Sequence, residues 1–518
     1  MTDAPLVLDG SPLRIEHVDA VARRAIPVRL AESQRPLLDR ARAALDRVAS
    51  DGEPHYGVNT GFGSLSRTRV GTDELVQLQL NLVRSHAAGI GEPLPDETVR
   101  AMLVILAASL SRGASGVRPI VVETILGLLN AGVTPIVPSI GSVGASGDLA
   151  PLAHASLVLL GEGRARVGDT QLPGAEALAA AGLKPLSLAP KEGLALINGT
   201  HLMAAEASLL LVDTAHVLAA GLVAGGLAID ACKATDAFLD TRVASLRAHP
   251  GVGHAASILR DLLAGSEIVD SHKLNDSRVQ DPYSLRCQPQ VLGAVIESCR
   301  AIARSVRLEL GAVTDNPLLF EGEGTGTLVS AGNFHGMPIA LPLDHLAIAL
   351  SHIAGMSERR VFYMLAGTDT EAALRPYLAT RPGLTSGLMI VQYTAAACCN
   401  ELIGLASPAS VANLSTSAGV EDYNSFGPRS AAKARRAVEL TASVVASELM
   451  CAAEAIDHHR PLRTGHVLER AHAMVRERVD RLEDDRSPSG DLETLRDAIV
   501  AGEFGALVDL VLWSDGAA

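Results

Sequence analysis

Long helical runs that are apolar around most of their circumference constrain this 518-residue chain more than any other feature. One run extends from Lys191 to about Thr235 as an Ala/Leu/Val pattern, interrupted by polar residues at helical spacing. Such a helix has no face suited to water, so other helices must wrap it. The sequence therefore predicts a mainly α protein built around a long-helix bundle.

Further helical patterns occupy Asp73–Val83, 97–111, 119–130, 288–312, 337–365, 386–406 and 429–456. Short extended pieces at Ala165–Val167 and Leu328–Val329 fit small hairpins around glycine-rich turns such as Gly322–Gly326. We expect two parts, although no linker clearly separates them. Residues 1–200 form a loop-rich N-terminal domain, and residues 201–518 form the long-helix bundle and the C-terminal helices.

The charge balance argues against some classes of binding partner. Lys and Arg total 44 and Asp and Glu total 58, so the net charge is 44 − 58 = −14. An acidic chain disfavours nucleic acid or an anionic membrane as partner. Several helices are too apolar to face water, and identical subunits are the expected cover. The sequence thus predicts a homo-oligomer, whereas its charge does not identify a substrate.

Location and metal content are also constrained. The N-terminal MTDAPLVLDG shows no basic n-region or apolar h-region, so we expect a cytoplasmic protein. The most lipid-like stretch, Thr214–Ile229, is shorter than the roughly 20 residues that span a bilayer, and a buried helix explains it better.

The six scattered cysteines fit reduced thiols. No HExxH motif is present, and no metal is expected.

The loop at 141–154 carries unusual chemistry. Three glycines within residues 141–147 surround the triplet Ala145-Ser146-Gly147 and permit backbone angles that other residues avoid. The Gly147 nitrogen can then approach the Ala145 carbonyl carbon. Ring closure with loss of two waters would give a 4-methylidene-imidazole-5-one, an electrophile that no side chain supplies. A second Ala-Ser-Gly, at 114–116, lacks this flank and is interpreted as a turn.

The loop resembles the active-site loop of the histidine, phenylalanine and tyrosine ammonia-lyases. Further motifs follow in family order from Tyr56 to beyond Glu421, so the resemblance covers nearly the whole chain. It implies a fumarase/aspartase-like helical architecture. It also implies a prosthetic group formed autocatalytically from Ala145, Ser146 and Gly147, with no metal and no external cofactor. The same resemblance implies a homotetramer whose active sites combine residues from several subunits.

The resemblance assigns roles in the first half of the chain. Tyr56, in the segment Tyr56–Gly63, is the base that removes the β-proton, from a mobile lid. A phenol suits this task only if nearby positive charge or donors lower its pKa from about 10. His86 contacts the side chain of the amino acid. Asn198 hydrogen-bonds the prosthetic ring or the substrate amine, and His201 stands where relatives usually carry a smaller or amide residue.

Three roles come from the motif Gln280–Cys287, and one from a later segment. Arg286 offers a planar fork to the substrate carboxylate. Tyr283 and Gln280 resemble residues that line the prosthetic group, and Tyr283 is counted with the catalytic residues. In Gly332-Asn333-Phe334-His335, the family role of Phe334 is to pack beside the prosthetic ring.

The region 420–426 bears on the substrate. Glu421 is acidic, as in histidine enzymes, but Val420 and Tyr423 replace the usual Gln and His, and Asn424-Ser425 looks more like the phenylalanine branch. The favoured activity is the non-oxidative deamination of L-histidine to trans-urocanate and ammonia, in histidine degradation. A tyrosine or phenylalanine ammonia-lyase or 2,3-aminomutase remains open, as does a non-catalytic helical scaffold of the same fold.

Overall fold

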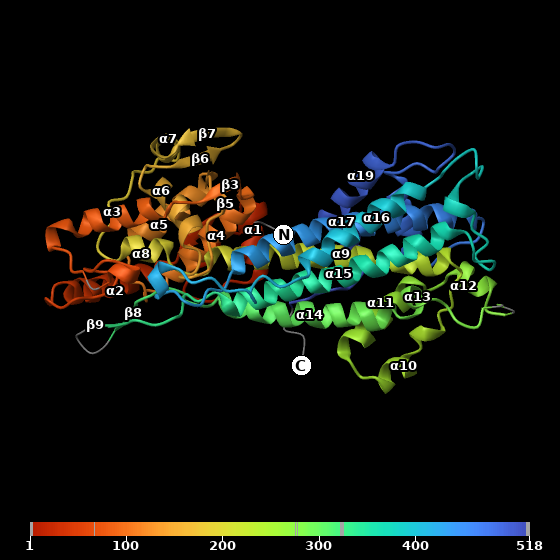
Figure 1. Ribbon diagram of the computed structural model, residues 1–518, viewed down its shortest axis with the longest axis horizontal. Coiled ribbons are helices and arrows are strands. Elements are labelled where there is room, and N and C mark those ends of the chain that lie inside the picture. Colours follow the sequence, from red (N-terminus) through yellow and green to blue (C-terminus); the bar gives the residue numbers. More distant parts are fainter. Residues whose placement is uncertain (1–3, 67, 275, 277, 322–325, 514–518) are drawn as a thin grey trace. The chain divides into compact units, whose positions relative to one another are not determined.

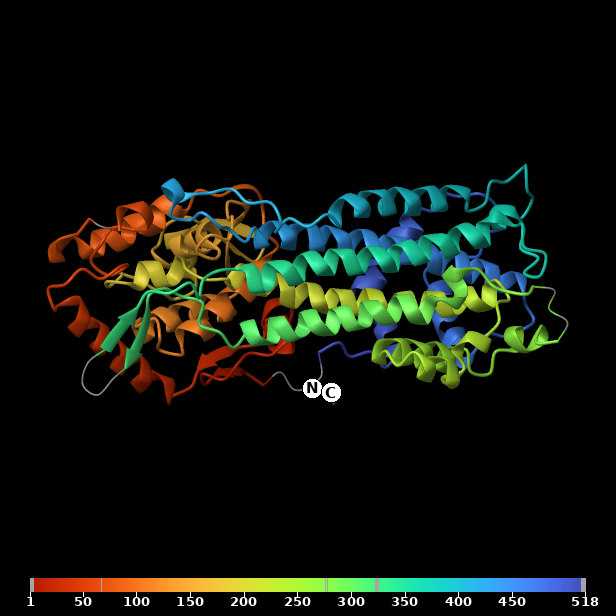
Figure 2. The ribbon, with the colours of Figure 1, turned by 60° about the horizontal axis from the view of Figure 1, so that its bottom comes forward.

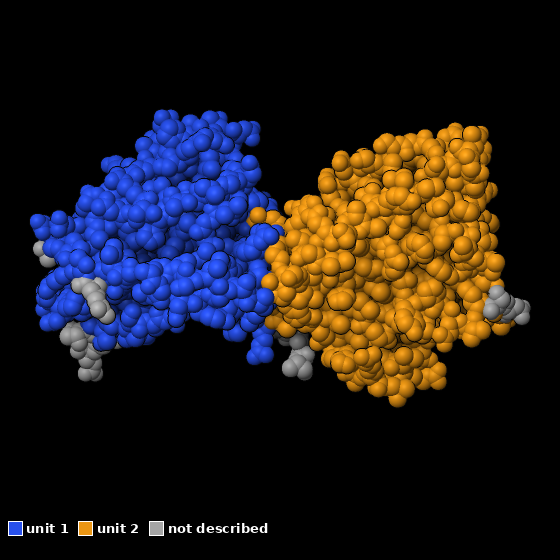
Figure 3. All heavy atoms as spheres, viewed as in Figure 1, with its two compact units in different colours: residues 1–209, 304–343, 409–432 blue, residues 210–303, 344–408, 433–518 orange. Residues whose placement is uncertain are grey.

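A computed structural model describes residues 4–66, 68–274, 276, 278–321 and 326–513 (Figure 1). Helices dominate the described residues and strands are short, which confirms the prediction of a mainly α protein. The chain forms two compact units, coloured separately in Figure 3. Unit 1 comprises residues 1–209, 304–343 and 409–432; unit 2 comprises residues 210–303, 344–408 and 433–518.

Unit 1 combines helices with a small amount of sheet. Its helices are α1 (Ile15–Arg23), α2 (Gln34–Ala49), α3 (Leu75–His86), α4 (Asp96–Leu110), α5 (Pro119–Asn130), α6 (Leu149–Leu159), α7 (Gly174–Ala180) and α8 (Glu192–Ile197). Local signals explain their starts: Asp96 and Glu97 lie in the first turn of α4, and Pro119 is the first residue of α5. Nearly every side chain of α4 is buried, as expected for a helix apolar on all sides.

In the described part of the chain, four small sheets accompany these helices. The strands are β1 (Leu6–Leu8), β2 (Val28–Leu30), β3 (Ile90–Pro93), β4 (Val133–Pro135), β5 (Pro138–Ile140), β6 (Arg164–Val167), β7 (Thr170–Pro173), β8 (Leu318–Glu321) and β9 (Gly326–Val329). β1 and β2 are parallel, whereas β3–β5, β4–β6–β7 and β8–β9 are antiparallel. The hairpins expected near Ala165–Val167 and Leu328–Val329 are present as β6–β7 and β8–β9, but residues 322–325 of the second turn lie outside the described residues.

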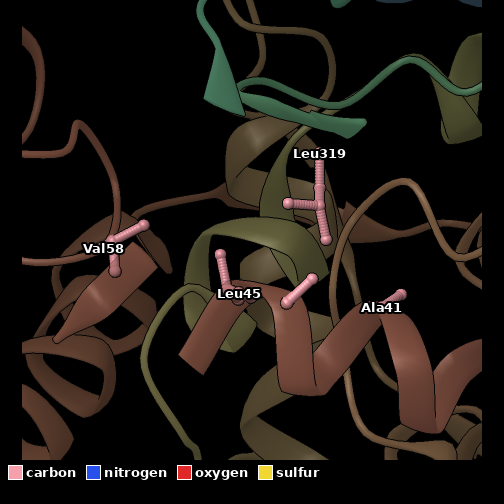
Figure 4. Close-up of a cluster of buried hydrophobic side chains, with 5 residues drawn as sticks. Ala41, Leu45, Val58 and Leu319 are labelled. Carbon is pink, nitrogen blue, oxygen red and sulfur yellow. The ribbon is translucent and has the colours of Figure 1, made fainter. Parts of the chain in front are cut away.

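The β8–β9 hairpin shows why residues 304–343 belong to unit 1. Leu319 of β8 packs against Ala41 and Leu45 of α2 and against Val58, and all four side chains are buried (Figure 4). Burying large aliphatic side chains stabilises such a cluster by about 1.5–3 kcal/mol each. A segment far along the sequence thus covers α2 (Figure 2).

Unit 2 is a helical bundle in which only helices are assigned as regular elements among the described residues. Those wholly inside it are α10 (Thr241–Leu246), α11 (Pro250–Leu262), α12 (Glu267–Ser271), α13 (Tyr283–Arg286), α16 (Met389–Leu405), α18 (His466–Arg476) and α19 (Ser489–Val500). Four helices contribute residues to both units: α9 (His201–Ala231), α14 (Gln288–Glu309), α15 (Met337–Ala366) and α17 (Gly427–His458). In unit 2, α14 and α15 run alongside one another in both Figure 1 and Figure 2.

The division of the chain differs from the expected domains 1–200 and 201–518. Unit 1 extends to Leu209 and takes in two later segments, because the hairpin and the 409–432 loop pack on N-terminal elements. The run from Lys191 to Thr235 is also not one helix. It breaks at Asn198–Thr200, where Asn198 is extended and Gly199 has a φ of +117°. The break therefore separates the short α8 from the long α9.

The length argument against membrane-spanning segments was wrong. Two helices, α9 with 31 residues and α15 with 30, are long and apolar enough to cross a bilayer by length and composition alone. Their most apolar windows are nevertheless 94% and 56% buried inside the protein. A core helix of a bundle passes the same test of composition, and the expectation that the apolar stretch is a buried helix is confirmed for α9.

Candidate active site

The triplet Ala145-Ser146-Gly147 lies in a tight loop that leads into α6. Gly147 forms a bridge with Gly199: the Asp148 N–H donates to the Gly199 carbonyl (2.7 Å), and the Gly199 N–H donates to the Ser146 carbonyl (3.2 Å). Gly147 has a φ of +72°, and a Cβ on it would lie 2.1 Å from the Gly199 oxygen. No other residue fits this position, so glycine is required here by packing as well as by backbone angle.

Gly144 on the other side of the triplet is equally constrained. Its φ is +67°, and a Cβ there would lie 2.0 Å from Ser425 Oγ. The Ser425 hydroxyl donates to the Gly144 carbonyl at 3.1 Å. Ser142 Oγ accepts from the Gly144 N–H at 3.1 Å and donates to the Gly147 carbonyl at 3.2 Å. Ser142 and Ser425 thus hold the loop in shape, a role that the sequence analysis assigned to neither of them.

Ser146 faces a cavity of about 510 Å³ in unit 1. The cavity brings together four of the site residues predicted from the sequence: Tyr56, His86, Ser146 and Glu421. Its remaining walls come from the segment Gly61–Leu65, from α3 (Leu78, Asn81, Leu82, Ser85), and from Leu149, Leu194 and Ser417. Ala145 and Gly147 flank Ser146, whereas Phe334 is half-buried in the turn before α15 and does not line the cavity.

Tyr56 lies in the turn after residue 55, with its ring edge-on to Phe62. Burial raises the pKa of its phenol, and the negative charge of Glu421 raises it further, while the Gly63 N–H that donates to the hydroxyl (3.4 Å) lowers it. The pKa of Tyr56 is thus raised overall, whereas action as a base near neutral pH requires a lowered pKa. A positively charged group other than those named here is therefore needed to lower the pKa of Tyr56 before the phenol can act as a base near neutral pH.

His86 ends α3, and its Nδ1 lies 2.8 Å from the Leu82 carbonyl oxygen. Because a carbonyl only accepts, we assign the proton of the neutral ring to Nδ1, which leaves Nε2 as an acceptor. Glu421 sits at a tight turn, and its Oε2 accepts from the Thr416 hydroxyl at 2.8 Å. The other carboxylate oxygen can accept from a bound ring. Thr416 is a further residue that the sequence did not reveal.

Asp148, directly after the triplet, is fully buried and was also missed. Its Oδ2 accepts from the backbone N–H groups of Leu202 (2.9 Å) and Met203 (3.0 Å) at the start of α9. Burial raises the pKa of Asp148 to about 7, against the opposing effect of these two donors. Its place in the sequence, between a glycine-rich loop and a helical pattern, is the signal that could have identified it.

His201, the first residue of α9, is buried beside the loop. Neither ring nitrogen has a hydrogen-bond partner within the described part of the chain. The ring lies against Gly199, where an added Cβ would come within 2.5 Å of Cε1. Burial lowers the pKa of His201 to about 4; the charge of Asp315 opposes this and that of Arg112 adds to it. The imidazole is therefore neutral at neutral pH.

Replacing His201 by glutamine should make the protein less sensitive to acid. The folded state keeps His201 neutral down to about pH 4, whereas the unfolded chain binds a proton below about pH 6.5. Wild type therefore loses about 2 kcal/mol from this residue between pH 8 and pH 5. Chemical denaturation at both pH values should show H201Q gaining about that much relative to wild type. A difference that is the same at pH 8 and pH 5 would contradict the argument.

Three of the four remaining predicted site residues lie in unit 2, whereas the fourth, Asn198, is buried in unit 1. Gln280, Tyr283 and Arg286 line a second cavity of about 500 Å³ together with Arg278, Asp281, Pro282, Tyr363 and Thr368–Thr370. The Arg286 guanidinium donates to the Asp281 carbonyl (2.8 Å) and to Gln280 Oε1 (2.7 Å), and it lies 4.8 Å from the centre of the Tyr283 ring. The motif is thus a pre-arranged cluster with a cation over an exposed phenol.

The helical fold and the amino-acid sequence as a whole are those of an ammonia-lyase, an enzyme that breaks a carbon–nitrogen bond. The family model described as aromatic amino acid lyase matches residues 13–477. The chain belongs to this family, which confirms the resemblance inferred from the motifs.

Individual relatives agree with this assignment. The chain is 46% identical over 508 residues to a histidine ammonia-lyase of Anaeromyxobacter sp. strain K, covering 96% of this chain and 99% of that protein. The crystal structure of histidine ammonia-lyase from Trypanosoma cruzi matches with a TM-score of 0.89 at 35% identity, over 97% and 95% of the two chains. Tyrosine aminomutase from Streptomyces globisporus matches with a TM-score of 0.92 at 32% identity, over 98% and 100%.

Proposed function

We propose that this protein is a histidine ammonia-lyase that converts L-histidine to trans-urocanate and ammonia. The observation that carries the proposal is the pairing of His86 and Glu421 in one cavity with Ser146. Both are polar groups that a substrate with ring hydrogen bonds would satisfy, and a phenyl ring would not. The similarity to curated histidine ammonia-lyases at 44–46% identity over nearly the full chain supports the same substrate.

The prosthetic group that we propose at Ala145-Ser146-Gly147 fits the loop. Glycine is required at 147 and 144, the Gly147 carbonyl is held by Ser142, and Ser146 faces the cavity. Once formed, a methylidene-imidazolone supplies an electrophilic carbon for activation of the substrate. We propose that it forms autocatalytically and that no metal or external cofactor takes part.

The remaining steps fall to side chains of this protein. Arg286 binds the substrate carboxylate with its planar fork, and Gln280, Tyr283 and Phe334 surround the prosthetic group. Glu421 accepts the imidazole N–H and His86 contacts the other side of the ring. Tyr56 takes the β-proton as the C–N bond breaks, which yields the double bond and ammonia. Cationic groups near the phenol, such as the substrate ammonium and Arg286, would offset its raised pKa.

A homotetramer with shared active sites accounts for two features. The nominated residues divide between the cavity of unit 1 and the cluster of unit 2. In addition, α16 has only Val391, Ala395 and Leu402 buried, while Ile390, Tyr393 and Ile403 are more than half exposed. Apolar faces of this kind are usually covered by another subunit. We propose that copies of this chain cover α16 and complete the sites, and that the enzyme is cytoplasmic.

Placing a charge on α16 should break the assembly. Ile403 is 72% exposed, and Ile403→Glu would bury a carboxylate in the proposed interface. Light scattering should show a tetramer for wild type and smaller species for I403E, with activity lost in parallel. Leu246→Glu is the matched control, because Leu246 is even more exposed but lies on α10; it should remain tetrameric. A wild-type monomer with full activity would contradict the proposal.

One observation favours a second candidate function, that of a tyrosine ammonia-lyase or aminomutase. Val420 and Tyr423 depart from the histidine pattern, and solved tyrosine aminomutases are close in fold. Both side chains are largely exposed, however, and neither lines the cavity that contains Glu421. Incubation with histidine, tyrosine and phenylalanine, followed by ultraviolet absorbance and product identification, decides between them. Histidine should react best; a β-amino acid product would identify an aminomutase, and no reaction would identify a scaffold.

A further inference from the structure

The side-chain amide of Asn198 has a fixed orientation. Asn198 is buried, and its Nδ2 donates both to Asp315 Oδ1 (3.1 Å) and to the Asn316 carbonyl oxygen (3.2 Å). These two bonds use both N–H groups. The amide oxygen, Oδ1, is buried and has no hydrogen-bond partner within the described residues. Asn198 is thus a hydrogen-bond acceptor without a donor, one residue from the bridge between Gly199 and Gly147.

Asp315, which accepts a hydrogen bond from Asn198, belongs to a buried ion pair with Lys191. Asp315 Oδ2 accepts from Lys191 Nζ, and Oδ1 also accepts from the Asn316 N–H at 2.7 Å. The side chains of Lys191 and Asp315 are only 1% and 3% exposed. Lys191 also adopts a left-handed backbone with a φ of +75° at the start of α8. Buried ion pairs often add little to stability, and a left-handed backbone at a residue other than glycine is strained. Stability alone therefore does not explain why Lys191 and Asp315 are paired here.

We propose that Lys191 and Asp315 are positioning residues that turn Asn198 so that it presents only an acceptor to the substrate amine. The opposite orientation would place the amide oxygen against the Asp315 carboxylate and the Asn316 carbonyl, with acceptor facing acceptor. Lys191 compensates the carboxylate charge, which could not otherwise be buried without great cost. The inference rests on the proposed function and assigns the role of Asn198 within it.

The chemistry of the loop excludes the other partner considered for Asn198. Ring closure of Ala145-Ser146-Gly147 consumes the N–H hydrogens of Ser146 and Gly147, so the resulting ring has no N–H to donate. Asn198 has no N–H left for the ring carbonyl either. Of the two partners considered, the substrate amine is therefore the one with N–H donors to offer, and a hydrogen bond to Oδ1 would orient it beside Ser146.

Binding to an inactive enzyme tests the inference. In the Ser146→Ala variant, calorimetry would compare L-histidine with the same acid lacking the amine, 3-(imidazolyl)propanoate. The amine-bearing ligand should bind more tightly, and adding Asp315→Asn should reduce this preference about tenfold or more. Glu192→Gln is the matched control: Glu192 is equally buried and ion-paired on α8, but its bonds go to Arg118 and Ala189. E192Q should leave the preference unchanged.

A double-mutant comparison separates positioning from a structural role. In an Asn198→Ala background, D315N should reduce the amine preference no further, because the group that it positions is gone. An equal loss from D315N with and without Asn198 would overturn the proposal. A crystal structure of the S146A enzyme with bound L-histidine gives a test that needs no second substitution. The amine should lie within hydrogen-bonding distance of Asn198 Oδ1, with Nδ2 still on Asp315.

The two possible failures are distinguishable. If none of the three aromatic amino acids binds to S146A, the proposed function is wrong, and the inference falls with it. If an amino acid binds with its amine away from Oδ1, the proposed function stands and the positioning role of Lys191 and Asp315 is wrong.

Discussion

Replacing Ser146 by alanine should lower kcat by at least about a thousandfold for every amino acid that the wild type deaminates. Loss of the Ser146 hydroxyl removes the second dehydration, so no methylidene carbon can form, and no side chain can substitute for it. Ser146 is only partly buried and faces the cavity, so the substitution removes one hydroxyl without leaving a large void. Steady-state kinetics measures the loss.

Intact-protein mass spectrometry measures the cause. Wild type should be lighter than its sequence by two waters, and S146A by no more than one. The chain provides a control in Ser115→Ala, since Ser115 is the buried serine of the other Ala-Ser-Gly triplet and has no hydrogen-bond partner for Oγ among the described residues. S115A should keep both the activity and the two-water deficit. Active wild-type enzyme at its full, uncyclised mass would refute the proposed prosthetic group.

Glu421→Gln should depress histidine turnover far more than turnover of tyrosine or phenylalanine. Thr416 holds one oxygen of Glu421, and the other is free to accept an imidazole N–H. The variant replaces two equivalent acceptors by one oxygen and one NH2 group, and it removes the charge. Losing this bond should cost about 1–3 kcal/mol, a fall of roughly 5- to 150-fold in kcat/KM for histidine. A phenyl ring makes no such bond and should lose little.

The control for this variant is Asp422→Asn, which neutralises the adjacent, exposed carboxylate and should leave the order of substrates unchanged. The comparison requires kcat/KM for all three amino acids in wild type and in both variants. If wild type deaminates tyrosine or phenylalanine well and histidine hardly at all, Glu421 does not select imidazole. In that case Val420 and Tyr423 are the better guides to the substrate.

Local sequence predicted most helices well, because their signals are local. α5 begins and ends at the residues expected, and α4 lies within one residue of the expected range. Proline at the first position and acidic residues in the first turn act over a few residues, and apolar periodicity needs only the helix itself. The loop 141–148 was recognisable for the same reason, since its glycines are adjacent in the sequence.

The break between α8 and α9 was not predictable in this way. Asn198 and Gly199 leave the helix because they bond to Ser146, Asp148 and Asp315, which are distant in the sequence. The pKa of Tyr56 shows the same limit. The role as base that the resemblance assigns to Tyr56 requires a lowered pKa, whereas burial and Glu421, more than 300 residues away in sequence, raise it.

The sequence by itself determined the helical class, the position of most helices and the glycine-rich loop around Ser146 on which the proposed chemistry rests. Only the tertiary structure decided that Tyr56, His86 and Glu421 meet Ser146 in one cavity, that Thr416 donates to Glu421, and that the buried pair of Lys191 and Asp315 lies beside Asn198. The physical reason is range: helix propensity and backbone freedom are local, whereas burial, charge interaction and hydrogen bonding between remote segments exist only after the chain has packed.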